Sequence, residues 1–274
     1  MTDKPFPFPI IDFHVHLFPD KLFEAIWKSF KVNYQWNVKY QIYTPQVIRF
    51  LRERGVKKIV YSNYAHKAGV AKALNSWNIE LLEQEPELYC FAAFHPDDPD
   101  HMEDAMRLLR HPRVLGFKLQ LLVQRFYPHD ERLFPLYQAV IGAGKRILMH
   151  VGTGPIGNEF VGITHFRKLL ARYPQLKVNV PHMGELEIPQ FLELLAEYPG
   201  VYFDTAFAFW PSQHRVYKVT PDDLVSHQDR IVYGSDFPNL IFDWDMEIRA
   251  LKEMNLGDAF YRKVFFENGL GLLE

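Results

Sequence analysis

The segment IIDFHVH, residues 10 to 16, places two histidines two positions apart at the end of a short apolar run. Side chains alternate across a β-strand, so residues two apart point to the same face. If the segment is a strand, Asp12, His14 and His16 share one face, and the apolar residues between them share the other. Two neutral imidazoles side by side are typical ligands of a transition-metal ion. The alternative at this point is a pair of histidines on a surface turn, with no ligand.

Seven further short apolar segments follow, and amphipathic stretches separate them. They are KKIVYSN (57–63), LYCFAAF (88–94), VLGFKLQ (114–120), KRILMH (145–150), LKVNVPH (176–182), GVYFDTA (200–206) and RIVYGSD (230–236). Eight alternating strand and helix units in 274 residues predict a closed (β/α)₈ barrel, formed as a single domain by residues 1–274. An open doubly wound sheet is the alternative, but the sequence contains neither a GxGxxG motif nor a P-loop to support it.

The composition narrows the classes of protein and of partner. The chain is 48% hydrophobic and 23% charged, which is typical of a globular protein with a substantial core. A net charge of -2 argues against a nucleic-acid interface and against a polybasic membrane patch. No uncharged apolar stretch approaches the roughly 18 to 20 residues of a membrane span. We therefore expect a small-molecule substrate, no nucleic-acid or membrane partner, and leave assembly of identical copies open.

The single cysteine and the N-terminus predict a cytoplasmic location. Cys90 is the one cysteine of the chain, so an internal disulfide cannot form, and a reducing compartment fits this composition. The first residues, MTDKPFPFP, contain no apolar core of the kind that a signal peptide needs.

Polar residues gather where the predicted strands end, which is where (β/α)₈ barrels place their catalytic groups. Of the 12 histidines, His14 and His16 close the first strand, His150 the fifth and His182 the sixth. Asp236 closes the eighth strand, and Lys118 lies in the fourth. The alternatives are a buried histidine bonded to the backbone for His150 and His182, and a helix N-cap for Asp236. The combined pattern favours a reactive site over these alternatives.

Five motifs in this order resemble the amidohydrolase superfamily, and in particular its amidohydrolase 2 branch. They are DFHVH (12–16), GFKL (116–119), MHVG (149–152), PHMG (181–184) and YGSDFP (233–238). The branch includes aminocarboxymuconate semialdehyde decarboxylase, related aromatic-acid decarboxylases and several lactonases. The closing segment VFFENGLGLL (264–273) is similar to the last helix of the family, although Asn268-Gly269 stands where an Asn-Ala pair is usual. The resemblance covers essentially the whole chain.

The resemblance implies a site with one divalent metal ion. His14, His16, His150 and Asp236 would be its ligands, with zinc the expected ion and manganese the second choice. Such an ion leaves a coordination position open for water and lowers the pKa of that water from about 15.7 to near 7. Asp236 would also accept the proton of this water, and His182 would polarise the substrate or transfer a proton. We therefore name Asp236 and His182 as the catalytic residues.

Lys118, Phe209 and Trp210 are the expected substrate contacts. Lys118 would be an unmodified ammonium that meets a carboxylate or carbonyl of the substrate. Its alternatives are a carboxylated lysine that bridges two metal ions, as in binuclear members of the superfamily, and a structural ion pair. Phe209 and Trp210 follow the seventh predicted strand and would line an apolar pocket, unless they only pack in the core.

Two activities fit this site. The first expectation is hydrolysis of a C–N or C–O bond in a small, carboxylated compound through metal-activated water. The alternative is a nonoxidative, metal-dependent decarboxylase of an unsaturated or aromatic acid. A barrel without activity, which serves as a scaffold, is a third class, and the intact set of ligand-type residues argues against it.

Overall fold

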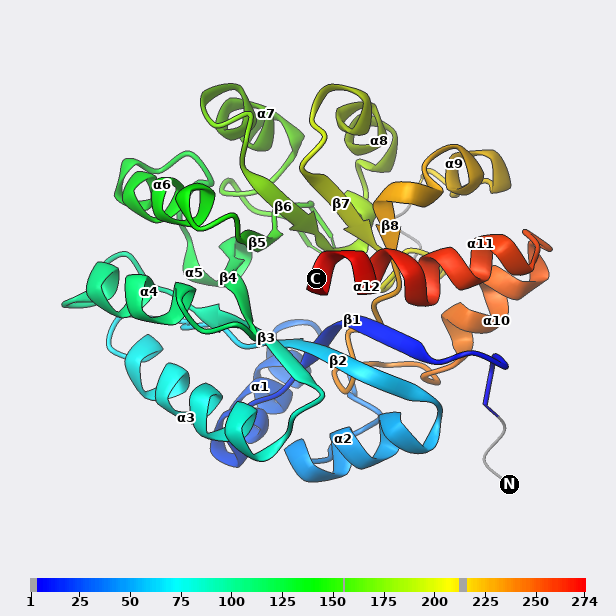
Figure 1. Cartoon of the computed structure of the whole chain (residues 1–274), viewed down its shortest axis with the longest axis horizontal. Coiled ribbons are helices and arrows are strands. Elements are labelled where there is room, and N and C mark those ends of the chain that lie inside the picture. Colours follow the sequence, from blue (N-terminus) through cyan, green and yellow to red (C-terminus); the bar gives the residue numbers. More distant parts are fainter. Residues whose placement is uncertain (1–3, 155, 212–215) are drawn as a thin grey trace.

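Eight parallel strands form one barrel-shaped sheet in the computed structural model, which describes residues 4–154, 156–211 and 216–274 (Figure 1). The strands pair in chain order, from β1 to β8. Their bounds are β1 Ile10–His16, β2 Val56–Ser62, β3 Leu88–Ala93, β4 Val114–Gln120, β5 Arg146–His150, β6 Lys177–Val180, β7 Val201–Asp204 and β8 Ile231–Val232. The predicted (β/α)₈ barrel is confirmed.

Helices cover the outside of the barrel because each has one apolar face to bury against the sheet. In α2, for example, Val47, Ile48 and Leu51 are buried on the face that meets the strands. The α-helices are α1 Asp20–Asn33, α2 Thr44–Glu53, α3 Ala71–Gln84, α4 His101–Leu109, α5 Leu121–Gln124, α6 Phe134–Gly142, α7 Ile163–Arg172, α8 Ile188–Glu197, α9 Pro221–Ser226, α10 Met246–Glu253, α11 Asp258–Arg262 and α12 Asn268–Leu273. Short helical turns are η1 Glu131–Leu133, η2 Pro181–Gly184, η3 Gln228–Arg230 and the π-helical η4 Lys263–Glu267.

None of the helices that the structure describes is both long enough and apolar enough to cross a membrane.

The barrel closes where β1 meets the residues that follow β8. The backbone N–H of Phe13 donates to the carbonyl of Tyr233 at 2.8 Å, and the N–H of Asp236 donates to the carbonyl of His14 at 2.7 Å. Residues 230 to 236 were expected to form one strand, but β8 contains only Ile231–Val232. The chain leaves regular strand geometry beyond it, and Asp236 itself has a left-handed φ of 60°. This irregular closure carries Asp236 to the end of β1.

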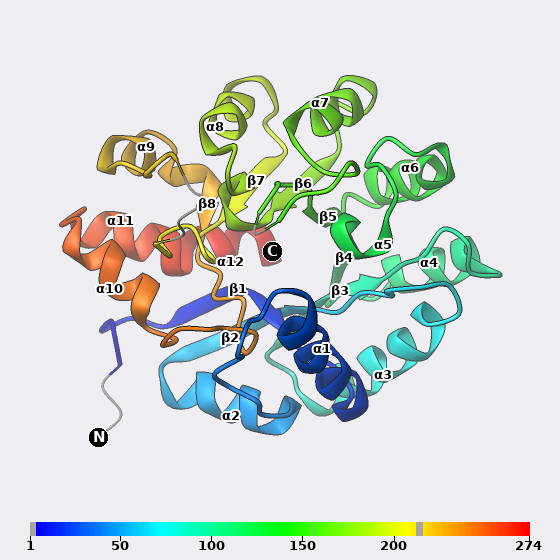
Figure 2. The same ribbon diagram turned by 180° about the vertical axis from the view of Figure 1, so that it is seen from behind.

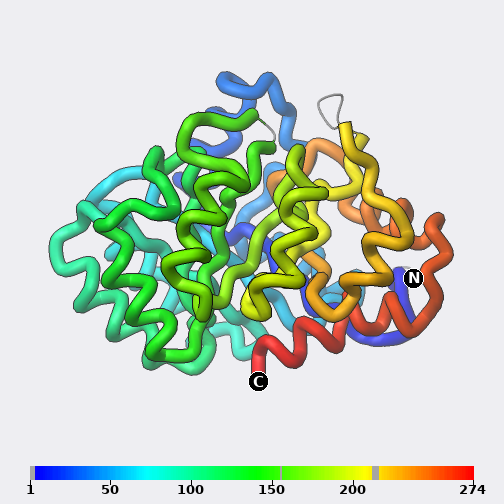
Figure 3. Tube along the Cα trace, turned by 90° about the horizontal axis from the view of Figure 1, so that it is seen from above, coloured from blue at the N-terminus to red at the C-terminus, as the bar shows by residue number. Residues whose placement is uncertain are grey.

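The C-terminal helix α12 covers one end of the barrel, and α1 lies at the other (Figure 2; Figure 3). Leu270, Leu272 and Leu273 pack against a cluster that includes Ile11 and Phe13 of β1. This apolar cover fills the end at which the strands begin. The opposite end, where the strands finish, is left for a functional site, as is usual in this architecture.

Gly116 is required by the close approach of β4 and β5. Its φ of 143° is rarely adopted by residues with a side chain, and a Cβ at this position would lie 1.7 Å from the carbonyl oxygen of Arg146. The glycine therefore permits the pairing that aligns Lys118 and Gln120 with β5.

Candidate active site

His14, His16 and Asp236 form a triad at the end of β1, in which the two histidines are buried and Asp236 is partly exposed. Nε2 of His16 lies 2.8 Å from Oδ1 of Asp236, and Nε2 of His14 lies 3.3 Å from the same oxygen. The two histidines point to one face because they are two residues apart on a strand, as the sequence predicted. Burial raises the pKa of Asp236, but the imidazoles of His14 and His16 outweigh this effect and hold the pKa below its ordinary range. Asp236 is therefore a carboxylate at neutral pH.

The proton positions in this triad favour a cation. Nδ1 of His16 lies 3.3 Å from the carbonyl oxygen of Ser62, and a carbonyl can only accept a hydrogen bond. A neutral His16 therefore carries its proton on Nδ1 and presents the lone pair of Nε2 to the Asp236 carboxylate. Two lone pairs repel each other at 2.8 Å unless a proton or a cation shares the site. His14, His16 and Asp236 also satisfy the distances expected of a metal-binding group.

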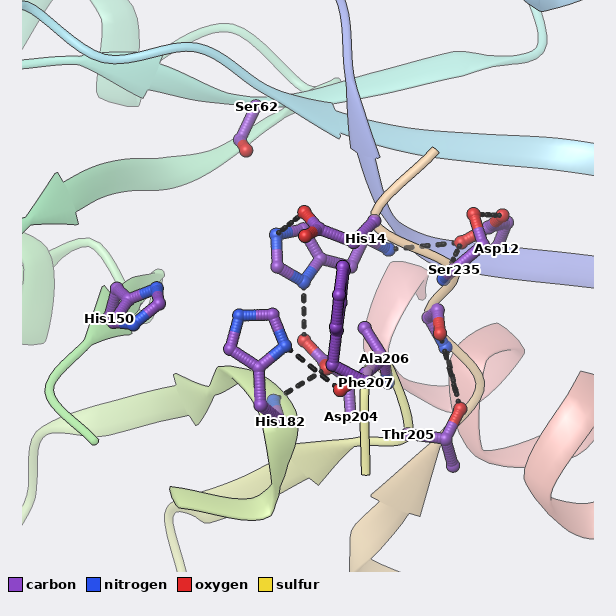
Figure 4. Close-up of polar contacts among 12 residues, drawn as sticks. Asp12, His14, Ser62, His150, His182, Asp204, Thr205, Ala206, Phe207 and Ser235 are labelled. Carbon is purple, nitrogen blue, oxygen red and sulfur yellow. Dashed lines mark hydrogen bonds and ion pairs between the residues drawn. The ribbon is translucent and has the colours of Figure 1, made fainter. Parts of the chain in front are cut away.

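Asp12, in β1, connects this strand to the segment after β8. Its carboxylate accepts hydrogen bonds from the hydroxyl of Ser235 at 2.6 Å and from the N–H groups of Ser235 and His14 at 3.0 and 3.2 Å (Figure 4). Burial raises the pKa of Asp12 to about 7, although the bonds from Ser235 and His14 lower it. Asp12 thus fixes Ser235, and with it the neighbouring Asp236, relative to His14.

His182 lies beside His14 but in a turn, not in a strand. β6 ends at Val180, and His182 falls in η2 with a left-handed φ of 58°. Its Nδ1 lies 2.9 Å from the carbonyl oxygen of Ala206, and its ring centroid lies 5.4 Å from that of His14. Burial lowers the pKa of His182 to about 4, against the opposing effect of Asp236 and Asp204. His182 is therefore neutral at pH 7, with the proton on Nδ1 and a lone pair on Nε2.

Asp204 is a site residue that the sequence analysis missed. It ends β7, and its Oδ2 lies 2.9 Å from Nδ1 of His14. His14, His182 and Asp204 form a second group with metal-binding distances. The signal was present in the sequence, because Asp204 in GVYFDTA follows an apolar run just as Asp236 does in RIVYGSD.

His150 stands next to His182, but its ring nitrogens face other partners. The two ring centroids are 4.9 Å apart. Nδ1 of His150 lies 3.3 Å from Nε2 of Gln120, and Nε2 lies 3.0 Å from the carbonyl oxygen of Gly154. Burial, followed by repulsion from His182 in its protonated form and from Lys118, lowers the pKa of His150 well below its ordinary value. The structure thus places His150 at the site, but outside the two groups with metal-binding distances (Figure 4).

Lys118 is fully buried below this cluster of histidines and carboxylates. Its Nζ has no hydrogen-bond partner in the described part of the chain. Burial lowers the pKa of Lys118 to about 8, against the opposing effect of Asp236 and Asp204. Lys118 is not among the residues that line the cavity. The structure therefore does not place it where the sequence analysis expected it, in contact with a substrate.

An aromatic cavity opens beside the triad. Its aromatic lining consists of Phe30, Tyr34, Trp36, Tyr64 and Phe207. Trp36, from the segment between α1 and α2, stacks on Phe207, with ring centroids 5.8 Å apart and ring planes within 5°. The polar lining consists of His14, His16, Gln120, His150, His182, Glu185, Asp236 and Asn239. The cavity has a volume of about 70 Å³ and opens to solvent on one side.

Phe209 and Trp210 lie away from the cavity, in contrast to the sequence-based expectation. Both line a separate pocket of about 600 Å³ together with Tyr217 and Met254. Trp210 stacks on Phe242 at 4.8 Å. The loop after β7 turns sharply, since Phe207 has a left-handed φ of 55° and its N–H donates to Glu247 of α10 at 2.9 Å. Of the aromatic residues in this loop, Phe207 reaches the site.

The donor set fits a divalent ion, because it combines imidazole nitrogens with a carboxylate. Apart from the carboxylate contacts, neither ring nitrogen of His14 has a hydrogen-bond partner among the described residues. Buried ring nitrogens normally have a hydrogen-bond partner, so a histidine whose two nitrogens both face carboxylates alone fits a cation-binding cluster.

Comparison with known proteins gives a family and a shared fold. A family model described as Amidohydrolase matches residues 11–273. No curated protein sequence matches the chain significantly. Among solved structures, an uncharacterised TIM-barrel protein from Bordetella bronchiseptica is 14% identical, with a TM-score of 0.72 over 97% of this chain and 98% of that one.

Two decarboxylases are among the similar solved structures. 2,6-Dihydroxybenzoate decarboxylase from Rhizobium is 16% identical, with a TM-score of 0.69 over 97% of this chain and 98% of that one. 5-Carboxyvanillate decarboxylase from Novosphingobium aromaticivorans, complexed with manganese and 4-hydroxy-3-methoxy-5-nitrobenzoic acid, is 15% identical. Its TM-score is 0.67 over 97% of this chain and 96% of that one. At these identities the likeness establishes the fold that the proteins share.

Proposed function

Because the chain belongs to the amidohydrolase family, we propose that it is a metal-dependent, nonoxidative decarboxylase of an aromatic or otherwise conjugated acid. The similar decarboxylases support this activity over hydrolysis of a C–N or C–O bond, which was the first expectation from the sequence. The observation that carries the proposal is the aromatic lining directly beside the His14–His16–Asp236 triad. Aromatic side chains beside the triad suit a planar substrate that can delocalise the electron pair left by CO₂.

His14, His16 and Asp236 would hold one divalent ion, and His150 would join them once its Nε2 is free of the Gly154 carbonyl. Zinc and manganese both accept these nitrogen and oxygen ligands. When bound, the ion supplies positive charge that offsets the charge of the substrate. Lys118 adds a positive charge beside the cavity. We propose that it acts electrostatically on Asp236 and Asp204 without touching the substrate.

Decarboxylation breaks the bond between the substrate carbon and CO₂ and forms a C–H bond at that carbon. One proton from solvent must therefore reach this position. We propose that Asp236 and His182 relay it from solvent, because both line the cavity and both are unprotonated at pH 7, so each can accept a proton and pass it on. Nε2 of His182 is free to accept a proton and pass it on, since Nδ1 donates to Ala206.

The test is incubation of the metal-loaded enzyme with panels of aromatic acids, unsaturated acids, lactones and amides. Decarboxylation predicts one CO₂ per substrate consumed and, in D₂O, one deuterium at the carbon that lost CO₂. In ¹⁸O-water the product would carry no label beyond solvent exchange. Label in a new carboxylate, without CO₂ release, would replace this proposal with hydrolysis. Trp77→Ala, which removes an indole on α3 outside the cavity lining, is the control for nonspecific damage.

A further inference from the structure

Asp204 is a buried carboxylate that contacts two residues of the site at once. Its Oδ2 lies 2.9 Å from Nδ1 of His14, while its Oδ1 accepts hydrogen bonds from the N–H groups of His182 at 2.9 Å and Ala206 at 3.2 Å. Figure 4 shows the carboxylate between the rings of His14 and His182. The residue is only 1% exposed, and burial of a charge is costly unless its oxygens have partners. Oδ1 has such partners in these two N–H groups, whereas among the described residues Oδ2 has only its contact with Nδ1 of His14.

The contact with Asp204 decides which nitrogen of His14 carries the proton. A carboxylate oxygen and an unprotonated ring nitrogen both present lone pairs, so in the metal-free protein a separation of 2.9 Å requires a proton on one of the two groups, and the more basic imidazole holds it. The proton of a neutral His14 therefore resides on Nδ1. Nε2, on the side of Asp236, then carries the lone pair that a metal ion needs.

The same carboxylate stabilises the turn that holds His182. His182 and Met183 have left-handed φ angles of 58° and 53°, a conformation that is costly for residues with a side chain. The N–H of His182 donates to Asp204. Nδ1 of His182 donates to the carbonyl of Ala206, which lies two residues after Asp204. The end of β7 thus holds His182 by both its backbone and its ring.

We propose that Asp204 is a positioning residue, which sets the His14 tautomer for metal binding and fixes the turn of His182 in the same step. The inference rests on the metal site of the proposed function, but it also describes the metal-free protein. The alternative is that Asp204 is itself a ligand, because His14, His182 and Asp204 have metal-binding distances. Ligation is disfavoured because Oδ1 already accepts the N–H groups of His182 and Ala206.

The test is Asp204→Asn, which keeps the shape and changes the hydrogen-bonding pattern. The amide oxygen can still accept the N–H groups of His182 and Ala206, so the amide NH₂ then faces Nδ1 of His14. Because two donors cannot face each other, His14 must move its proton to Nε2 and lose its ligand lone pair. We expect ¹⁵N-histidine NMR of the metal-free variant to show this change of tautomer. Competition with a chromogenic chelator should show about 10- to 100-fold weaker zinc or manganese binding.

Asp98→Asn is the matched control. Asp98 is also buried and also accepts two backbone N–H groups, from Gly69 and Ala71, but it does not line the cavity. Its variant should keep the His14 tautomer and the metal affinity. An Asp204→Asn variant with unchanged tautomer and affinity would overturn the proposal, as would two bound ions in the wild type and one in the variant.

The wild-type spectrum keeps the inference testable if Asp204→Asn does not fold. A metal-free wild-type protein with the His14 proton on Nε2 contradicts the proposal without any variant. This measurement needs neither substrate nor turnover, so its failure is distinct from a failure of the proposed decarboxylase activity.

Discussion

His14 and His182 have rings 5.4 Å apart but different surroundings, so their substitutions should have different effects. His14→Ala removes a nitrogen of the triad, and we expect both metal and activity to be lost. His182→Asn leaves the triad intact, and we expect stoichiometric metal with activity reduced by about 10² to 10⁴, which is typical of a lost acid–base group. Elemental analysis and CO₂ release measure the two effects. A His182→Asn protein without metal would place His182 among the ligands instead.

Cys90 should be unreactive in the folded protein. It lies in β3 with no exposed surface, and burial raises its pKa to about 12. Because the thiolate is the reactive form, only about one molecule in 10⁴ is reactive at pH 8. We expect a thiol reagent to label the native protein very slowly at this pH and the denatured protein completely. Rapid labelling of the native protein would show that β3 opens locally.

The residues of regular strands were predictable from the sequence, and those of turns were not. Strand alternation alone predicted that His14 and His16 share a face. His182 could be assigned to the site, but its left-handed turn depends on bonds to Asp204 and Ala206, which are distant in the sequence. Phe209 and Trp210 were placed in the cavity because they follow a strand. The contact between Phe207 and Glu247, which directs that loop, has no local signal.

The segment between α1 and α2 forms a wall of the cavity through Tyr34 and Trp36. We predict that Trp36→Ala, which removes the ring stacked on Phe207, widens the cavity and weakens substrate binding. Loss of an aromatic contact worth about 1.5 to 3 kcal/mol corresponds to roughly a 10- to 150-fold rise in KM. The measurement is KM and kcat for the identified substrate, with Trp77→Ala as the control. A fall in KM would mean instead that Trp36 obstructs entry.

The pairing of β4 with β5 depends on one glycine. Gly116→Ala would place a methyl group 1.7 Å from the carbonyl oxygen of Arg146 at a φ of 143°. Backbone strain and overpacking each cost about 1 to 3 kcal/mol, so we expect a loss of roughly 2 to 6 kcal/mol in the free energy of unfolding. Gly142→Ala on α6 is the control, because a Cβ there meets nothing within 4 Å. Denaturant titration should show the first variant strongly destabilised and the second unchanged or slightly more stable.

At the scale of the whole molecule, a bound ion should stabilise the folded chain. Its proposed ligands come from β1 and from the residues after β8, so the ion would connect the first and last strands of the barrel. An ion that binds only the native state adds about 4 kcal/mol when its free concentration is a thousand times Kd. We expect chelation to lower Tm by several degrees and added zinc or manganese to restore it. His14→Ala should show no such dependence on metal.

The architecture was predictable because it repeats. Eight apolar runs with helices between them leave few alternatives to a (β/α)₈ barrel, and the structure confirms it. The short β8 was not predictable, since RIVYGSD has the pattern of a full strand and only its docking on β1 shows where regular pairing ends. The single domain over residues 1–274 and the cytoplasmic location stay predictions, and the assembly of identical copies stays open.

The closure of the barrel between β1 and the residues after β8 also affects how a newly made chain acquires its ion. A ribosome that adds about 5 to 20 residues per second makes His14 and His16 early, and Asp236 only tens of seconds later. Until then the nascent chain presents two histidines without their carboxylate, a pair that holds an ion weakly. Metal loading must therefore follow synthesis. The ions that surround the chain when its last strand docks, and not those present when its N-terminal segment is made, would decide which metal the enzyme carries.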